Sequence, residues 1–219
     1  MKLLAYEVDK RSFLGIFNEN ETWAYPISAA GMEYRSMKDL IREAGPSEME
    51  MLDYISKKAP GDVTGAAPVE EIKIVSPIPE PDQDIICLGI NYMDHAAESA
   101  RFQKEEFARP EKAIYFSKRV NRTNDPDGII PAHKNLTNQL DYEAELAVII
   151  KKDAKDVKPE EVKDYIFGYT IMNDVSAREV QTEHKQWYFG KSLDGFTPLG
   201  PCIMTVDSTA FQYNSTDME

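Results

Sequence analysis

The stretch that decides the fold is DYEAELAVII, residues 141–150. Its apolar run predicts an interior strand that is buried on both faces. A second run of this kind, YIFGYTIMNDV, occupies residues 165–175. Shorter strand patterns surround these two, and helical patterns do not alternate regularly with them. The sequence therefore favours a mixed α/β, β-rich fold, with a mixed sheet or β-roll rather than a doubly wound parallel sheet.

Residues 1–68 predict a small N-terminal α/β domain followed by a linker. The strand patterns cover residues 2–8, 12–17 and 22–27, and the helical patterns cover residues 36–44 and 47–58. Ser47 and Glu50 have the spacing of a capping box at the start of the second helix. The segment APGDVTGAAP, residues 59–68, holds two glycines and two prolines, as expected of a linker. Residues 69–219 then predict a larger, β-rich domain.

The larger domain carries its own strand and helix signals. Strand patterns cover residues 71–75, 84–90, 113–117, 143–151 and 165–172, and helical patterns cover residues 95–107 and 176–187. Asp94 is a suitable N-cap for the first of these helices. Ser176 and Glu179 have the spacing of a capping box for the second.

Composition excludes several classes of function. The 219 residues include 25 Lys and Arg against 38 Asp and Glu, a net charge of −13, which argues against binding to nucleic acids or anionic membranes. No apolar run is long enough to span a membrane, and the first ten residues, which include Glu7 and Asp9, do not resemble a signal peptide. Cys87 and Cys202 are expected to be buried, reduced thiols, which favours a cytoplasmic location.

Three carboxylates lie at the ends of the two long apolar runs. Glu143 and Glu145 are two apart, so a strand places them on one face, ~6.6–7 Å apart. Such a pair is costly unless a cation lies between its members, although a hydrated strand end explains the spacing equally well. Asp174 closes the second run and favours a metal site. A set of oxygen ligands specifies Mg²⁺ or Mn²⁺, and Ca²⁺ is less suited.

A second candidate group is the pair His95 and Glu98. The two residues are three apart and share one face of the predicted helix. A carboxylate beside an imidazole orients the ring and stabilises its cation, which makes a usable general base. Taken alone, the spacing favours an ordinary exposed pair. The pair gains a catalytic meaning only if it faces the three carboxylates.

Arg178, Gln181 and Lys191 form the third candidate group. Arg178 and Gln181 are one helical turn apart, and an arginine can grip a carboxylate with two hydrogen bonds. Lys191 follows Gly190 and could neutralise a substrate carboxylate or a developing oxyanion. The alternative is a solvated helix face with an ordinary surface lysine.

Several motifs occur in an order that resembles the fumarylacetoacetate hydrolase family. They are GINYMDHAAE (89–98), YFSK (115–118), LDYEAELAVII (140–150), GYTIMNDVSAREVQ (168–181) and QWYFGKSLDGFTPLGP (186–201). The resemblance covers residues 71–205 and includes fumarylacetoacetase, acylpyruvate hydrolase and 2-hydroxyhepta-2,4-diene-1,7-dioate isomerase types. The tail QYNSTDME, residues 212–219, is similar to a segment that follows a further hairpin in the family. We therefore expect a C-terminally truncated member.

The resemblance implies a mixed β-sandwich roll with a small N-terminal domain, usually as a homodimer. It implies that Glu143, Glu145 and Asp174 hold Mg²⁺ or Mn²⁺. It further implies that His95 and Glu98 form a catalytic dyad and that Lys191 is catalytic. The residues it assigns to substrate binding are Asn91, Tyr92, Lys118, Arg178 and Gln181.

The function implied is hydrolysis of a C–C bond in an acylpyruvate or fumarylacetoacetate-like 2-oxo or 1,3-dicarbonyl acid. The reaction would pass through an enolate stabilised by the metal ion. One alternative is an isomerase or decarboxylase of a related 2-oxo diacid, such as a heptadienedioate isomerase or an oxaloacetate decarboxylase. Another is a truncated, inactive member that acts as a binding protein.

Overall fold

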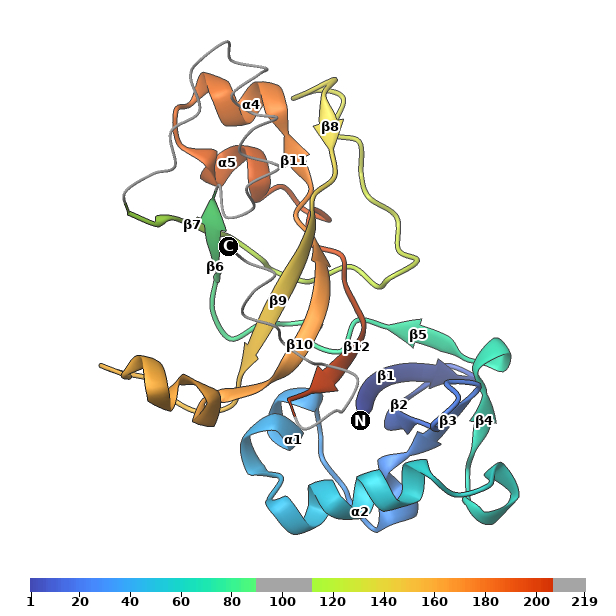
Figure 1. Ribbon diagram of the computed structural model, residues 1–219. Coiled ribbons are helices and arrows are strands. Elements are labelled where there is room, and N and C mark those ends of the chain that lie inside the picture. Colours follow the sequence, from blue (N-terminus) through green and yellow to red (C-terminus); the bar gives the residue numbers. More distant parts are fainter. Residues whose placement is uncertain (90–111, 207–219) are drawn as a thin grey trace.

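A single antiparallel sheet runs through most of the molecule. The computed structural model describes residues 1–89 and 112–206. The sheet order is β4-β3-β2-β1-β12-β10-β9, and β5 also pairs with β1 (Figure 1). Its strands are β1 (Lys2–Val8), β2 (Arg11–Phe17), β3 (Trp23–Pro26), β4 (Ala67–Pro68), β5 (Lys73–Val75), β9 (Ala144–Ile150), β10 (Ile166–Asn173) and β12 (Leu199–Thr205).

Smaller elements lie at the two ends of this sheet. Two-stranded sheets form from β6 (Ile85–Gly89) with β7 (Ile114–Lys118), and from β8 (Leu140–Asp141) with β11 (Ser176–Ala177). The α-helices are α1 (Met37–Glu43), α2 (Pro46–Ser56), α4 (Arg178–Glu183) and α5 (Trp187–Lys191). Short 3₁₀ helices are η1 (Ile27–Ala30), η2 (Pro60–Asp62), η3 (Val69–Glu71) and η4 (Pro159–Asp164). Figure 1 shows α1 and α2 at one end of β9 and β10, and α4 and α5 at the other.

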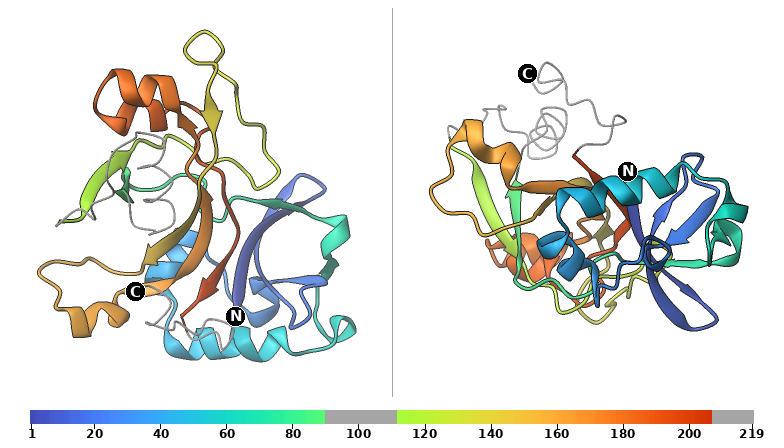
Figure 2. Two further views of the ribbon diagram at one scale, coloured as in Figure 1. Left: turned by 45° about the horizontal axis from the view of Figure 1, so that its top comes forward. Right: turned by 90° about the horizontal axis from the view of Figure 1, so that it is seen from below.

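The main core crosses from the N-terminal half into the second half. Leu3, Leu40 and Leu52 are fully buried between the N-terminal strands and α1 and α2. Phe167 of β10 and Ile203 of β12 belong to the same cluster. β12 pairs with both β1 and β10, and Figure 2 shows it between the two halves. One continuous sheet therefore joins the two predicted domains.

The N-terminal elements begin and end within a few residues of their predicted bounds. The predicted capping box of Ser47 and Glu50 is wrong. α2 begins at Pro46, with Gly45 as the N-cap, and Glu48 accepts a 2.9 Å hydrogen bond from the Gly45 N–H. A proline is favoured in the first turn because its missing N–H is not needed there, so the helix starts earlier than predicted.

The predicted helix over residues 176–187 is also wrong in its bounds, since α4 ends at Glu183 and Trp187 begins a separate helix, α5. Ser176 is a buried residue of β11, which pairs with β8, and the helix α4 begins only at Arg178. The Glu179 carboxylate does not cap this helix. It accepts hydrogen bonds from the Thr137 hydroxyl and the Asn138 N–H, both at 2.9 Å.

The expectation that residues 141–150 are buried on both faces is wrong as well. β9 is the last strand of the sheet in the described part of the chain. Leu146, Val148 and Ile150 are each about half exposed on its outer face. The run is apolar on both faces, but only the face with Glu145 and Ile149 is partly covered.

Three further expectations concern a helix, membrane spans and the two cysteines. The predicted helix over residues 95–107, with Asp94 as its N-cap, lies outside the described residues. No helix in the described ranges is long and apolar enough to cross a membrane. Cys87 and Cys202 are free thiols, as predicted, although each is only partly buried.

Candidate active site

The adjacent ends of β9 and β10 bring two of the predicted carboxylates together. Glu143 comes directly before β9 and Asp174 directly after β10. The Asp174 N–H donates to the Glu143 carbonyl at 2.8 Å, and the Glu143 N–H donates to Asn173 Oδ1 at 3.1 Å. The antiparallel pairing of β9 with β10 therefore determines that Glu143 and Asp174 are neighbours.

Two buried lysines contact the Asp174 carboxylate. Lys118 Nζ of β7 lies 2.6 Å from Asp174 Oδ1, and Lys191 Nζ of α5 lies 2.6 Å from Oδ2. All three side chains are almost completely excluded from water. Burial lowers the pKa of Lys118, and the negative charge of Asp174 opposes this change. Buried charges are tolerated when they are paired in this way.

Lys118 and Lys191 each have a second acceptor. Lys118 Nζ donates to the Val175 carbonyl at 3.1 Å, and Lys191 Nζ donates to Glu143 Oε2 at 2.9 Å. Lys191 is therefore not the ordinary surface lysine that its sequence context alone allows. The full burial of Lys118 favours a role in holding Asp174, and its predicted contact with substrate stays a prediction.

Arg178 lies at the rim of the same cluster and contacts three acceptors. Its Nη1 lies 2.6 Å from Glu143 Oε1, and its Nε and Nη2 lie 3.0 and 2.7 Å from Asp141 Oδ2. Gln181 Oε1, one helical turn further along α4, accepts a hydrogen bond from Nη1 at 3.1 Å. In this arrangement the guanidinium group holds two protein carboxylates.

Glu145 is the carboxylate of the site whose negative charge has no cationic side chain in direct contact in the described ranges. It pairs across the sheet with Met172, two residues before Asp174. Burial raises its pKa, and the charges of Glu143 and Asp174 raise it further, while Lys191 opposes them. No hydrogen bond or ion pair joins the Glu145 carboxylate to another side chain in the described ranges. The site thus holds negative charge that a cation could balance.

The donor set fits a hard divalent cation in its chemistry, since all three predicted ligands offer carboxylate oxygens. Glu143 and Asp174 both contact the Lys191 ammonium group, and Glu145 lies two residues after Glu143 in the chain. Within the described residues, however, no three carboxylate, imidazole or thiol side chains already form a metal-binding group. The Lys191 ammonium group lies between Glu143 and Asp174. A metal ion would compete with this ammonium group for the same oxygens.

Cys87 faces the cluster from β6 but is unsuited to nucleophilic chemistry. Burial raises the pKa of its thiol to about 12, and the charge of Asp174 adds to the effect. The thiol therefore remains protonated near neutral pH, and a protonated thiol is a poor nucleophile.

Sequence reasoning missed Asp141 and Ser176 as neighbours of the site. Ser176 Oγ lies 3.3 Å from Glu143 Oε1, and Asp141 binds Arg178. A signal was present, because each of these residues lies two positions from a predicted ligand in an extended segment. The predicted site residues Asn91, Tyr92, His95 and Glu98 lie outside the described residues.

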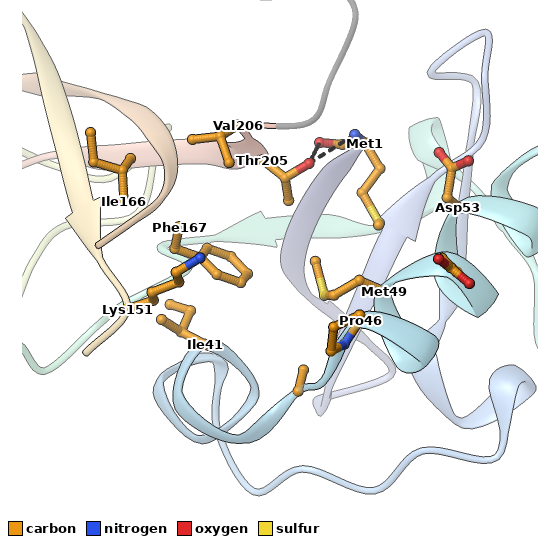
Figure 3. A pocket seen from close by; sticks show the side chains of 12 residues that line it. Met1, Ile41, Pro46, Met49, Asp53, Lys151, Ile166, Phe167, Thr205 and Val206 are labelled. Atoms are coloured by element: carbon orange, nitrogen blue, oxygen red, sulfur yellow. Dashed lines mark hydrogen bonds between the residues drawn. The ribbon is translucent and has the colours of Figure 1, made fainter. Parts of the chain in front are cut away.

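A cavity of about 470 Å³ lies at the other end of β9 and β10 (Figure 3). Its wall includes Ile41, Met49 and Phe167, with Lys151 at the end of β9 and Ile166 at the start of β10. Glu143 and Asp174 flank the opposite ends of these strands. The cavity is therefore separate from the carboxylate cluster.

Comparisons with known proteins identify a family and relatives that match between about three fifths and nearly all of this chain. The family model "Fumarylacetoacetate (FAA) hydrolase C-terminal" matches residues 84–216. Oxaloacetate tautomerase YisK of Bacillus subtilis (strain 168) is 42% identical over 149 residues, which are 67% of this chain and 48% of the relative. An uncharacterised protein of Staphylococcus epidermidis, SERP0556, is 31% identical over 217 residues, covering 94% of this chain and 70% of the relative.

Solved structures show the same fold. Fumarylacetoacetate hydrolase from Exiguobacterium antarcticum has a TM-score of 0.72 at 32% identity, covering 97% of this chain and 68% of that chain. Maleylpyruvate hydrolase from Sphingobium sp. SYK-6, solved with manganese(II) and pyruvate, has a TM-score of 0.64 at 25% identity, covering 94% of this chain and 68% of that chain. This chain spans about half the length of YisK and about two thirds of the other relatives. The matches confirm the predicted β-rich α/β fold, and the chain belongs to the fumarylacetoacetate hydrolase family.

Proposed function

We propose that this protein is a divalent-metal-dependent enzyme that converts a small 2-oxo acid through its enolate. The observation that carries the proposal is the cluster in which Lys191 and Arg178 converge on Glu143 and Asp174. Such a cluster offers carboxylate oxygens for a cation and N–H donors for an anionic substrate within one partly water-excluded site. The net charge of −13 repels anions at long range, so local cations have to offset it.

We assign the predicted metal ligands Glu143, Glu145 and Asp174 to Mg²⁺ or Mn²⁺. When bound, the ion would act as a Lewis acid that stabilises negative charge on the 2-oxo oxygen. The manganese in the related maleylpyruvate hydrolase supports this assignment. Release of Lys191 from Glu143 and Asp174 would free both the oxygens and the ammonium group.

The remaining residues act on the substrate and its protons. Lys191 would donate hydrogen bonds to the developing oxyanion, and Arg178 with Gln181 would bind a carboxylate at the rim. His95, oriented by Glu98, would serve as the general base. Asn91, Tyr92 and Lys118 complete the predicted substrate-binding set.

Two reactions fit this arrangement. Hydrolysis of a C–C bond in an acylpyruvate-type acid is the reaction that the sequence motifs predict, and it needs His95 to activate a water molecule. Keto–enol tautomerisation of a 2-oxo diacid needs proton transfer only, and the 42% identity to an oxaloacetate tautomerase favours it. Isomerisation or decarboxylation of a related 2-oxo diacid would use the same enolate.

A substrate panel separates these reactions. The chain is incubated with Mg²⁺ or Mn²⁺ and with oxaloacetate, acetylpyruvate, fumarylpyruvate or a heptenedioate, and products are followed by absorbance and mass spectrometry. A tautomerase speeds the approach of oxaloacetate to its keto–enol equilibrium without changing its mass, whereas a hydrolase releases pyruvate from an acylpyruvate. Metal binding without turnover of any of these acids would instead support a binding protein.

The role of the dyad can be tested separately from metal binding. We expect His95→Ala to lower kcat by roughly 10²–10⁴ with little change in metal affinity, because a general base contributes about that factor. Glu98→Gln removes the charge that stabilises the imidazolium cation, so the acidic limb of the pH–rate profile should move to lower pH. An unchanged profile in Glu98→Gln would leave Glu98 as an ordinary surface residue.

A further inference from the structure

The short helix α5 rests on the β6–β7 pair through one large side chain. The Trp187 ring, at the start of α5, lies against Gly89 at the end of β6. It also meets the Phe116 ring of β7 edge to face, with centroids 5.3 Å apart and planes at 71°. Trp187 thus anchors the first residue of the helix to two neighbouring strands.

Gly89 leaves the space that the indole ring fills. A Cβ atom at position 89 would lie 2.9 Å from Trp187 Cη2 and still closer to Cζ3. Real Cβ atoms do not approach ring carbons so closely, and any other residue at position 89 would displace the ring. The contact between Gly89 and Trp187 is therefore specific in size.

Lys191 lies at the other end of the same helical turn. It is four residues after Trp187, so both side chains lie on one face of α5. The Lys191 ammonium group is 5.1 Å from the centroid of the Phe116 ring that Trp187 contacts. From this position it reaches Glu143 Oε2 at 2.9 Å and Asp174 Oδ2 at 2.6 Å.

We propose that Trp187 is a positioning residue, which holds α5 on β6 and β7 so that the Lys191 ammonium group stays between Glu143 and Asp174, and that Gly89 provides the space for its ring. Trp187 acts on the carboxylates only through the position of Lys191, because Trp187 itself forms no polar contact with Glu143 or Asp174. The consequence for turnover rests on the proposed function, whereas the placement of Lys191 can be measured without substrate or metal.

The test is chemical labelling of lysines in the folded 219-residue chain. The protein is reductively methylated with formaldehyde and cyanoborohydride, and labelling at Lys191 is measured over time by peptide mass spectrometry. Lys118 is an internal control, because it is also buried and bound to Asp174 but lies on β7. Tyr188→Leu is the matched control, since Tyr188 is an exposed aromatic residue of the same helix.

We expect Trp187→Leu and Gly89→Ala each to raise the labelling rate at Lys191 by about tenfold or more, because local opening exposes buried groups. Labelling at Lys118 should stay at its wild-type rate, and Tyr188→Leu should behave like the wild type. In a Trp187→Leu background, Gly89→Ala should add little, since the ring that it displaces is already absent. This non-additivity is the signature of the contact between the two residues.

The proposal is overturned if Lys191 keeps its wild-type labelling rate in the folded single variants. It is also overturned if Lys118 and Lys191 become reactive together, because that outcome indicates general loosening. If Trp187→Leu does not fold, the labelling rates at Lys191 and Lys118 are compared in Trp187→Phe instead, with the same expected and contradicting results. Where the wild type turns over a 2-oxo acid, the variants should lower kcat more than they change KM. Absence of wild-type turnover would refute the proposed function alone.

Discussion

Asp174 accepts hydrogen bonds from two lysine ammonium groups while its side chain is almost completely excluded from water. Glu143 shares one of these lysines and also contacts Arg178. Glu145 adds a third carboxylate without an ion-pair partner in the described ranges. At the residue scale, the carboxylates and the cationic side chains of the site share partners. Removing one charged side chain therefore changes the ion pairs of the others.

The first prediction is that variants of the metal ligands and a variant of Lys191 have opposite effects on metal affinity. We expect Glu143→Ala, Glu145→Ala or Asp174→Ala to abolish divalent-ion binding and activity, because the ion loses one of three anionic ligands. Lys191→Met should lose activity but keep or increase its affinity for Mn²⁺, since the ammonium group occupies the same oxygens. Titration calorimetry with Mn²⁺ measures both effects. Full activity of the wild type in excess chelator would refute the metal site.

The second prediction concerns the raised pKa of Glu145. Burial, then the charges of Glu143 and Asp174, raise this pKa above 4.5 in the folded protein. The folded state therefore binds more protons than the unfolded state between 4.5 and the raised pKa, and ionised Glu145 destabilises the fold above it. Glu145→Gln should be more stable than the wild type at neutral pH without divalent ions, and this advantage should shrink as the pH falls through the raised pKa.

Urea unfolding of both proteins at several pH values, without divalent ions, measures this difference. Mg²⁺ should then stabilise the wild type more than Glu145→Gln, because an ion that binds only the folded state adds to its stability. Identical unfolding curves at neutral pH would contradict the prediction.

At the scale of elements, β12 connects the two halves of the molecule. It pairs with β1 on one side and with β10 on the other, where the register shifts between Tyr169 and Ile171. Gly168 of β10 lies directly against β12. A Cβ atom at position 168 would lie 3.0 Å from Ile203 Cγ2 and would overlap the Met204 carbonyl oxygen. The close approach of these strands therefore depends on a glycine.

The third prediction follows from this contact. We expect Gly168→Ala to lower the free energy of unfolding by roughly 1–3 kcal/mol, because overpacking forces neighbouring backbone to shift. Gly61→Ala is the control, since a Cβ atom there meets no heavy atom of the described residues within 4 Å, and it should change stability by less than about 0.5 kcal/mol. Chemical denaturation measures both, and equal effects would contradict the prediction.

At the scale of the whole molecule, the outer face of β9 and part of β10 are largely uncovered by the described residues. Leu146, Val148 and Ile150 of β9 are about half exposed, and Ile171 of β10, which pairs with Leu146, is 59% exposed. β9 also ends the sheet in the described part of the chain. Exposed strand edges and apolar patches both promote association.

The last prediction is that this 219-residue chain forms a dimer or a larger assembly, or else aggregates. Sedimentation measures its size. Replacing Leu146 and Val148 together by Lys should shift the chain towards smaller species, because charges on the apolar face oppose association. Val162→Lys is the control, since Val162 is similarly exposed on η4. A wild-type monomer that unfolds cooperatively would contradict the prediction.

The sequence by itself determined the features that depend on neighbouring residues. The alternation and apolar runs placed β9 and β10, and the order of the motifs indicated the family. The spacing of Glu143 and Asp174 at the ends of these runs singled out the two carboxylates that the structure brings together. Strand periodicity is a local property, and it is therefore readable without knowledge of the fold.

Only the tertiary structure decided which charges meet and which faces are covered. Lys118 lies 56 residues from Asp174 and Lys191 lies 48 from Glu143, so their ion pairs depend on how β7 and α5 pack against the ends of β9 and β10. Likewise, the apolar run over residues 144–150 could not reveal that its outer face is exposed. A hydrophobic sequence indicates which side chains a strand can bury. Whether they are buried depends on which other elements pack against that strand.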